Sequence, residues 1–256
     1  MKQFGEHGEI DRAVRCEDCG VRKLALFQPL SQEEIAAAQS FRRAFRELKA
    51  GSSIFRQGSP NTEVYTLHSG WAYLYQNLAD GGRQILRFVL PGDFFGFQAD
   101  VGDGQRLHSA RAITPVALCV FNRSDLLAMF KEHLELGVRL TWLTAYDEVV
   151  AYEHLASLGR RSAEERIAYL LLELFNRVRL REQDPKHVHT VRIPLTQELI
   201  ADACGLTQVH VNRTMKSLQG KNILTFHSKK LHVPDPDRLA VMANHNHNFF
   251  VLKPML

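Results

Sequence analysis

The sequence has no run of eighteen apolar residues, and it opens with the polar stretch MKQFGEHGEIDR. A membrane-spanning helix needs about twenty apolar residues, and a secretory leader needs an apolar segment behind a positive end. We therefore expect a soluble, cytoplasmic protein with no membrane partner. Cysteine is also scarce, with 4 in 256 residues, and the four are scattered. Scattered cysteines are typical of a reducing compartment, where structural disulfides are rare.

The composition excludes a disordered or fibrous chain, because 45% of the residues are apolar. The length is enough for two modest cores, so we expect two domains. The formal net charge is +4, whereas residues 160–240 alone hold 14 Lys and Arg against 9 Asp and Glu. This C-terminal part therefore carries the positive balance, which favours contact with a phosphate backbone.

The stretch from Leu195 to Gln219 predicts two short helices joined by a tight turn. Thr196 can cap a first helix over residues 197–204, and Thr207 can cap a second over residues 208–219, because a Thr hydroxyl accepts a bond from a free backbone N–H. Gly205 between them permits the left-handed conformation that the turn needs. Apolar residues recur at three- and four-residue spacing, so each helix should bury one stripe.

The polar residues left on the second helix are donors suited to base edges and phosphates in a major groove. A following pair of short strands around His227–Lys230 reads as a wing, whose lysines suit phosphate contact. An ordinary helical hairpin with a solvated basic face and a solvated turn is the alternative interpretation. The predicted DNA-binding set is Thr196, Thr207, Gln208, His210, Asn212, Arg213, Lys216, Lys229 and Lys230.

The N-terminal half predicts an antiparallel sandwich or barrel. From Leu24 to about Leu48 the pattern favours a helix, capped by Ser31 with Glu34 completing a capping box. Residues 49–121 then form short runs rich in Val, Ile, Tyr, Phe and Leu, separated by Gly-, Pro- and Asp-containing turns at regular spacing.

A long helix is predicted over residues 133–158, after a short element at 124–130. Its apolar positions lie at roughly heptad spacing, so we expect it to pack against a copy of itself in a homodimer; the alternative is a core helix of its own chain. The predicted seam is Leu136, Leu140, Leu143, Val150 and Ser157, with Tyr146 beside it. Residues 159–161 would form a hinge, and Ser162 with Glu165 would start a helix that forms the core of the last domain.

These motifs resemble the Crp/Fnr superfamily of bacterial transcription regulators. The turn Gly205-Leu206-Thr207 with Arg213 six residues after the Thr is similar to the family's helix-turn-helix. Earlier glycine-containing motifs are similar to its cyclic-nucleotide-binding domain, in particular Gly51-x-x-Ile-x-x-x-Gly58 and residues 90–96, LPGDFFG. Many members have Glu where this chain has Val209, so their half-site sequence cannot be transferred.

The resemblance implies an α+β protein with an antiparallel double-stranded β-helix (jelly-roll) barrel, a long dimerisation helix and a winged helix-turn-helix. It implies a homodimer that binds a palindromic site in double-stranded DNA and works with RNA polymerase. The expected division is an N-terminal cysteine-containing extension, a sensor barrel, the dimerisation helix, the DNA-binding domain and a tail, at residues 1–29, 30–130, 131–158, 160–240 and 241–256.

The resemblance also indicates which effector the barrel could bind. Members that bind cyclic AMP have a Glu for the ribose and an Arg-Ser pair for the phosphate, whereas this chain has Phe97 and His108-Ser109 at those places. A buried phosphate needs a fixed cation or several N–H donors. We therefore expect an effector pocket that includes Phe97, His108 and Ser109 and does not accept cyclic AMP.

Cysteines supply the remaining candidate site. Iron–sulfur members of the family hold a cluster with three N-terminal cysteines and one from the barrel, and Cys16, Cys19 and Cys119 match three of these positions. The fourth position is Ala25, so a cluster would need a substitute such as Asp18, His7 or a small molecule. A thiol switch and a silent remnant are the two alternatives.

A metal enzyme with a cupin-like barrel and an appended helical domain is the rival function. Such enzymes place a His-x-His pair and a Glu on facing barrel strands. The two His-x-His pairs of this chain, His187/His189 and His245/His247, lie outside the predicted barrel. We therefore expect no enzymatic activity, and the tail pair is interpreted as part of a flexible end.

Overall fold

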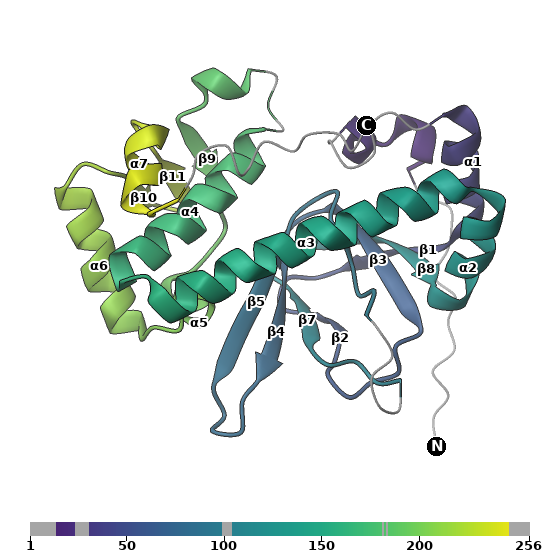
Figure 1. The fold of residues 1–256 in the computed structure, drawn as a ribbon, viewed down its shortest axis with the longest axis horizontal. Helices are drawn as coiled ribbons and strands as arrows, with labels where there is room; N and C mark the ends of the chain where they lie inside the picture. The colour runs from purple at the N-terminus through teal and green to yellow at the C-terminus, as the bar shows by residue number, and fades with distance from the viewer. Residues whose placement is uncertain (1–13, 24–30, 99–103, 181, 183, 246–256) are drawn as a thin grey trace. The chain divides into compact units, whose positions relative to one another are not determined.

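The computed structural model describes residues 14–23, 31–98, 104–180, 182 and 184–245. The chain forms two compact units (Figure 1): residues 1–74 with 88–143, and residues 75–87 with 144–256. The positions His7, Ala25 and His247 lie outside the described residues. Within the described residues, no helix is long and apolar enough to cross a membrane.

Two four-stranded antiparallel sheets form the barrel, as expected. One has the strand order β1-β8-β3-β6 and the other β2-β7-β4-β5. Large apolar side chains fill the space between them, including Tyr65, Leu67 and Leu118. The strands are β1 Arg42–Leu48, β2 Ser53–Phe55, β3 Glu63–Ser69, β4 Ala72–Asn77, β5 Arg83–Val89, β6 Phe94–Phe95, β7 Ser109–Ala112 and β8 Val116–Asn122.

The helix predicted up to Leu48 is wrong in its second half. Helix α1 spans Gln32–Phe41, and Ser31 and Glu34 form the expected capping box at its start. The chain then continues directly as β1, which pairs with β8 as far as Leu48 opposite Val116. Backbone pairing across seven residues overrides the weak helical propensity of RRAFREL. The short 3₁₀ helices η2, Cys16–Asp18, and η3, Gly20–Lys23, precede α1.

Helices α2, Arg123–Glu132, and α3, Leu134–Arg160, agree with the two predicted elements, but the predicted dimer seam of α3 faces its own chain. Leu136, Leu140 and Leu143 line an apolar pocket together with residues of β3, β6, β8, α1 and α2. Val150 and Ser157 are buried in the single chain. The heptad pattern therefore marks the face that α3 packs onto the protein's own core.

The C-terminal unit holds the predicted winged helix-turn-helix. Helix α4, Ala163–Arg179, starts with the Ser162–Glu165 capping box and buries its apolar side chains in the core. Helices α5, Gln197–Cys204, and α6, Gln208–Gly220, pack on it. A three-stranded sheet of order β10-β11-β9 follows, from β9 Thr190–Arg192, β10 Thr225–His227 and β11 Lys230–His232.

Three elements of this unit are absent from the sequence-based prediction. They are η5, Pro185–His187, the strand β9, and the helix α7, Pro236–Met242. Strand β9 makes the wing a three-stranded sheet, because β11 pairs with it as well as with β10. Helix α7 is capped by the Asp235 side chain and packs on α4, so the region predicted as tail from residue 241 begins inside a helix.

Candidate nucleic-acid interface and regulatory sites

The caps of α5 and α6 and the turn between them are formed by the residues predicted to form them. The Thr196 hydroxyl accepts the N–H of Leu199 at 3.2 Å, and the Thr207 hydroxyl accepts the N–H of His210 at 3.2 Å. Gly205 has φ 62° and ψ 42°, the left-handed conformation that the turn requires. Since both hydroxyls accept capping bonds, Thr196 and Thr207 position the starts of the two helices.

The exposed start of α6 forms a groove with α5. It is lined by Gln197, Gln208, Val209, Asn212, Arg213 and Lys216. Gln208, Arg213 and Lys216 are exposed, as predicted for residues that meet DNA, and His210 is half-buried. The Asn212 amide donates to the Gln197 side chain at 3.2 Å, so it also ties α6 to α5.

Sequence reasoning missed Val209 and Gln197 as lining residues. Val209 is 81% exposed at the start of α6, where it stands between polar neighbours. Exposure of an apolar side chain at a recognition helix has a specific use, because the 5-methyl group of thymine is the apolar feature of the major groove. The signal available in the sequence was an apolar residue outside the buried stripe of α6.

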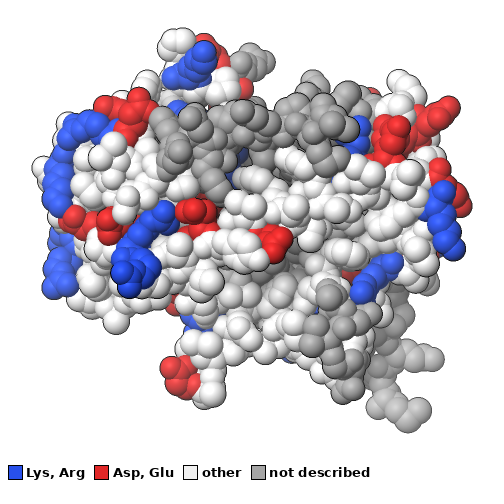
Figure 2. Space-filling view, viewed as in Figure 1, with Lys and Arg blue, Asp and Glu red and all other residues white. Residues whose placement is uncertain are grey.

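The wing presents both predicted lysines. Ser228 and Lys229 have φ 51° and 61°, so the two central residues of the hairpin turn are both left-handed, the backbone form of a tight two-residue hairpin. The carbonyl of Lys229 accepts the N–H of Ile193 at 2.9 Å, and this bond joins the hairpin turn to the residue that follows β9. Lys229 and Lys230 are exposed. Figure 2 shows Lys and Arg on the part that carries α6, with Asp and Glu side chains among them.

The interior of the barrel is filled by aromatic rings. Phe55 stacks on Tyr65 at 5.7 Å between ring centroids, and Tyr65 on Phe95 at 5.4 Å. The buried guanidinium of Arg106 lies 3.9 Å from the centroid of Phe55 and donates to the carbonyls of Gly96 and Glu63. Arg106 is the buried cation that sequence reasoning missed, and two of its N–H groups bond to backbone carbonyls.

The three predicted pocket residues do not share one surface. Phe97 is 40% exposed and its ring lies 6.4 Å from that of Phe94. Ser109 is buried, and its hydroxyl accepts the N–H of Gln57 at 2.9 Å. His108 is half-buried beside Phe55, where burial and then the charge of Arg106 lower its pKa to about 4. Ser109 is therefore buried, His108 half-buried and Phe97 exposed.

Cys16, Cys19 and Cys119 converge on the outer side of the first sheet. Burial raises the pKa of Cys119 to about 11, opposed by Arg42 and assisted by the nearby thiols of Cys16 and Cys19. The sulfur of Cys19 lies 3.4 Å from Nδ1 of His68, a residue that sequence reasoning did not associate with the cysteines. Burial, and then the charge of Arg42, lower the pKa of His68.

These groups do not form a metal centre as they stand. Across the described residues, no group of three or more His, Cys, Asp or Glu side chains is arranged to hold a metal ion. The His-x-His residues lie away from the barrel: His187 ends η5, His189 precedes β9, and His245 follows α7. His245 is packed against the ring of Tyr169, so the interpretation of this segment as a flexible end is wrong at that residue.

Comparison with known proteins gives two matching families and full-length relatives. Residues 45–133 match the cyclic nucleotide-binding domain, and residues 165–242 match the Crp-like helix-turn-helix domain. The nitrogen fixation regulation protein FixK of Bradyrhizobium diazoefficiens is 31% identical to this chain. The matching region covers 89% of this chain and 93% of FixK. The transcriptional activatory protein AadR of Rhodopseudomonas palustris is 33% identical to this chain, and the matching region covers 90% of this chain and 93% of AadR.

A solved structure is similar over most of the chain. The structure of FixK2 from Bradyrhizobium japonicum has a TM-score of 0.69 and 28% sequence identity, and covers 78% of this chain and 96% of its own.

Proposed function

The chain belongs to the Crp/Fnr family of DNA-binding transcription regulators, and on that premise we propose that it reads a palindromic site as a homodimer. The exposed start of α6, with Gln208, Arg213 and Lys216 over a groove, is the observation that carries the proposal. A helix of this composition fits a major groove. We assign base-edge contact to Gln208 and Arg213, with Asn212 beside them, and phosphate contact to the lysines.

Helix α3 supplies the proposed dimer contact through the face opposite the predicted seam. The exposed apolar side chains of α3 are spaced so that they lie on one face of the helix. They are Leu134, Val138, Val149, Tyr152 and Leu155. A row of exposed apolar residues along a helix of 27 residues is costly in water. In Figure 2 the surface over the middle of α3 is largely uncharged. Burial against a second α3 related by a two-fold axis removes this surface from water and presents two copies of α6.

We also propose that the protein works with RNA polymerase and lies in the cytoplasm. A relative that is 33% identical bears the name transcriptional activatory protein, and an activator acts on the polymerase at the promoters it binds. The cytoplasm is where bacterial DNA lies. We propose that the protein acts by binding and not by catalysis, since its relatives are named as regulators.

Cyclic AMP is not the proposed effector. A bound cyclic phosphate would have to make room among stacked rings beside an Arg106 side chain that already bonds to the carbonyls of Gly96 and Glu63. Titration calorimetry checks this, and we expect no heat of binding. A dissociation constant in the low micromolar range, about −8 kcal/mol, would contradict it.

The convergence of Cys16, Cys19 and Cys119 supports a redox response. The described residues bring together three thiols and the imidazole of His68, one thiolate fewer than the four that hold a four-iron cluster. We therefore assign the response to the thiols themselves, with Cys16 and Cys19 as the pair that lies close together in the sequence.

The redox test compares DNA affinity before and after a thiol oxidant. Affinity should change in the parent and in Cys204→Ala, whose thiol is buried in α5 with its pKa raised by burial to about 12. It should not change in the Cys16→Ser/Cys19→Ser double variant. An equal change in that variant would contradict the assignment. A stable iron–sulfur absorption after anaerobic reconstitution with iron and sulfide would show that a cluster forms after all.

DNA binding itself is tested by mobility shift with genomic fragments. We expect a small set of fragments to shift at protein concentrations at which bulk DNA does not. Loss of that selectivity in the Arg213→Ala variant would support the role of α6, whereas uniform binding of all fragments by the parent would contradict sequence-specific recognition.

A further inference from the structure

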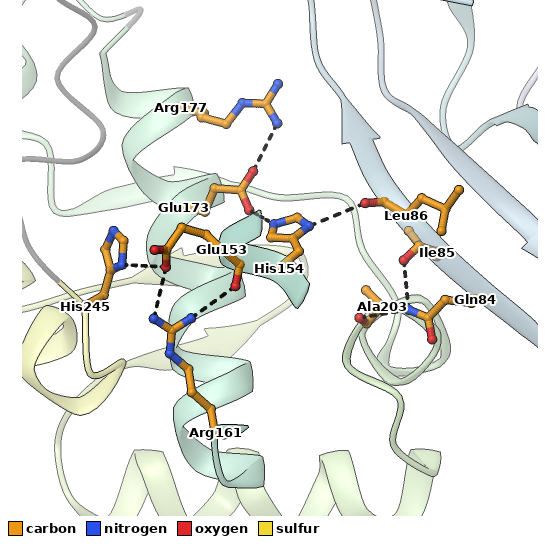
Figure 3. A network of polar contacts seen from close by, with 10 residues as sticks. All are labelled: Gln84, Ile85, Leu86, Glu153, His154, Arg161, Glu173, Arg177, Ala203 and His245. Carbon is orange, nitrogen blue, oxygen red and sulfur yellow. Dashed lines mark hydrogen bonds and ion pairs between the residues drawn. The ribbon is translucent and has the colours of Figure 1, made fainter. Parts of the chain in front are cut away.

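The imidazole of His154 lies between two hydrogen-bond acceptors (Figure 3). Its Nε2 is 2.7 Å from the carboxylate of Glu173 on α4, and its Nδ1 is 3.4 Å from the carbonyl oxygen of Leu86 on β5. A ring nitrogen bonds to an acceptor only when it carries a hydrogen, and neutral imidazole has one such nitrogen. Both bonds exist together only in the imidazolium form.

The surroundings of His154 favour that charge. Glu173 is 2% exposed and would be a costly buried anion without partners. Its other oxygen accepts from Arg177 at 3.3 Å. Burial alone lowers the pKa of His154, and the attraction and hydrogen bond of Glu173 outweigh it, so the pKa is raised above its ordinary value. Burial likewise raises the pKa of Glu173, and His154 and Arg177 together bring it below the ordinary value.

The other ionisable groups around this pair belong to a neighbouring network. The ring of Tyr169 on α4 meets that of His154 edge-on at 5.6 Å. Beyond it, Arg161 donates to the carboxylate of Glu153 at 3.2 Å, and the ring of His245 lies 3.4 Å from the same carboxylate. Figure 3 shows the two groups side by side, with Glu153 and His154 adjacent on α3. Arg177 opposes the charge of His154, and Glu173 is the anion that holds it.

Strand β5 also contacts α5, the first helix of the helix-turn-helix, through side-chain hydrogen bonds and ion pairs. At the start of β5, Arg83 pairs through Nε with Asp202 at 2.8 Å and through Nη2 with Glu198 at 3.1 Å, both on α5. Gln84 donates to the carbonyl of Ala203 at 3.2 Å. Two positions of β5, Arg83 and Gln84, thus contact α5 directly. A third, Leu86, is linked through His154 of α3 to Glu173 of α4.

We propose that His154 is a positioning residue for DNA recognition, which as an imidazolium joins β5 to α4 and, with Arg83 and Gln84, fixes the orientation of α5 and α6. None of these contacts covers the exposed residues of α6 that line the groove. Fixing the helices before DNA arrives reduces the ordering that binding must otherwise supply. The inference rests on the proposed DNA-binding function and adds the residue that sets its pH dependence.

The direction of the pH effect follows from the raised pKa of His154. The junction is complete while the imidazole is protonated, and it loses one of its two bonds as the pH rises through the raised pKa, above about 6.5. Specific DNA affinity should therefore fall as the pH rises through that range. The wing carries another imidazole, the exposed side chain of His227, so the parent must be compared with a variant that lacks only the imidazole of His154.

The experiment measures the affinity of the full-length protein for a duplex selected by the protein itself, from pH 6 to about 8.5, by fluorescence anisotropy. His154→Gln keeps one donor and cannot gain a proton. We expect it to bind about threefold to tenfold more weakly than the parent at the acid end, and to converge with the parent at the alkaline end. His154→Arg carries a permanent charge and should restore affinity without the pH dependence.

Two further variants separate the roles. Arg83→Gln removes the direct grip on α5, so it should weaken binding while the pH dependence of the parent remains. His227→Gln removes an exposed histidine of the wing and should leave the difference between the parent and His154→Gln intact. Circular dichroism at each pH confirms that the variants are folded.

Parallel pH profiles for the parent and His154→Gln, both folded and both binding the selected duplex, would overturn the role of His154. Failure of His154→Arg to bind better than His154→Gln at alkaline pH would overturn it too. Failure of the folded parent to prefer any sequence at any pH would instead overturn the proposed function, and this inference with it.

Discussion

At the scale of single residues, we expect some side chains of α6 to contact bases and others to contact the DNA backbone. Arg213 is exposed in the groove of α6, and Arg213→Ala should weaken specific binding by about 1–3 kcal/mol and relax preference at one base. Lys216→Ala should weaken binding to all sequences alike and reduce the salt slope by about one. Anisotropy at several salt concentrations measures both. Unchanged affinity of Arg213→Ala for the selected site would contradict its role.

Val209 gives a second prediction at this scale. Because its side chain is apolar and 81% exposed beside Arg213, we expect it to contact a thymine methyl group in each half-site. Replacing that thymine by deoxyuridine should cost the parent about 0.8 kcal/mol per methyl group. Val209→Ser should bind the two duplexes equally, whereas Gln208→Ala should still distinguish them. A parent that is insensitive to every such replacement would exclude this contact.

Residue identity in the sequence predicted the helix caps, the turn glycine and the exposed polar residues of α6. It did not predict what fills the barrel, because Arg106 is paired with carbonyls of residues 43 and 10 positions away, which only the fold brings together. The same holds for His68, which is 49 residues from Cys19 in the sequence. Phe97 was assigned to the pocket by its place in a motif, and the backbone turn at Gly96, with φ 83°, precedes an exposed ring.

At the scale of elements, the turn between α5 and α6 gives a stability prediction. A Cβ added at Gly205 would make only ordinary contact, 3.6 Å from the Leu158 side chain, but φ is +62°. Gly205→Ala should therefore lower the free energy of unfolding by about 1–2 kcal/mol through backbone strain. Gly220, at the end of α6, has open space and no positive φ, so Gly220→Ala is the matched control and should not destabilise. Urea unfolding measures both; equal stability of the two variants would contradict the strain.

The exposed face of α3 gives the prediction for assembly. Leu155 is 69% exposed on that face, and Leu155→Glu should shift the protein from dimer to monomer, because a charge at a two-fold contact is repeated by its partner. Leu127 is 63% exposed on α2, outside the row, and Leu127→Glu should remain dimeric. Sedimentation velocity distinguishes these states. A dimer that survives Leu155→Glu together with Val138→Glu would place the interface elsewhere.

Elements with strong local signals were predicted, and those that depend on distant partners were not. The capping boxes at Ser31 and Ser162 marked the starts of α1 and α4 correctly. The end of α1 and the strand β1 could not be located, because β1 exists through its pairing with β8, some seventy residues later. Strand β9 has three residues and is likewise defined by β11. The heptad pattern of α3 showed that a face is buried, and it could not tell a partner subunit from the chain's own core.

At the scale of the whole molecule, the order of motifs predicted a barrel, a long helix and a winged helix-turn-helix, and the fold and the relatives confirm this architecture. Sequence did not predict that the β4–β5 segment joins the DNA-binding unit, since its contacts with α5 link residues 119 and 115 positions apart. The proposed function depends on both halves: a reading surface at α6, and an assembly that presents it twice.

Selection of bound duplexes from a random pool by the full-length protein tests this central claim most directly. We predict a consensus with two-fold symmetry, whose half-sites lie about one turn of DNA apart, bound by two protomers per duplex. Arg213→Ala should lose preference at the same base in both halves. A consensus without symmetry, one protomer per site, or no enrichment over the starting pool would contradict the account.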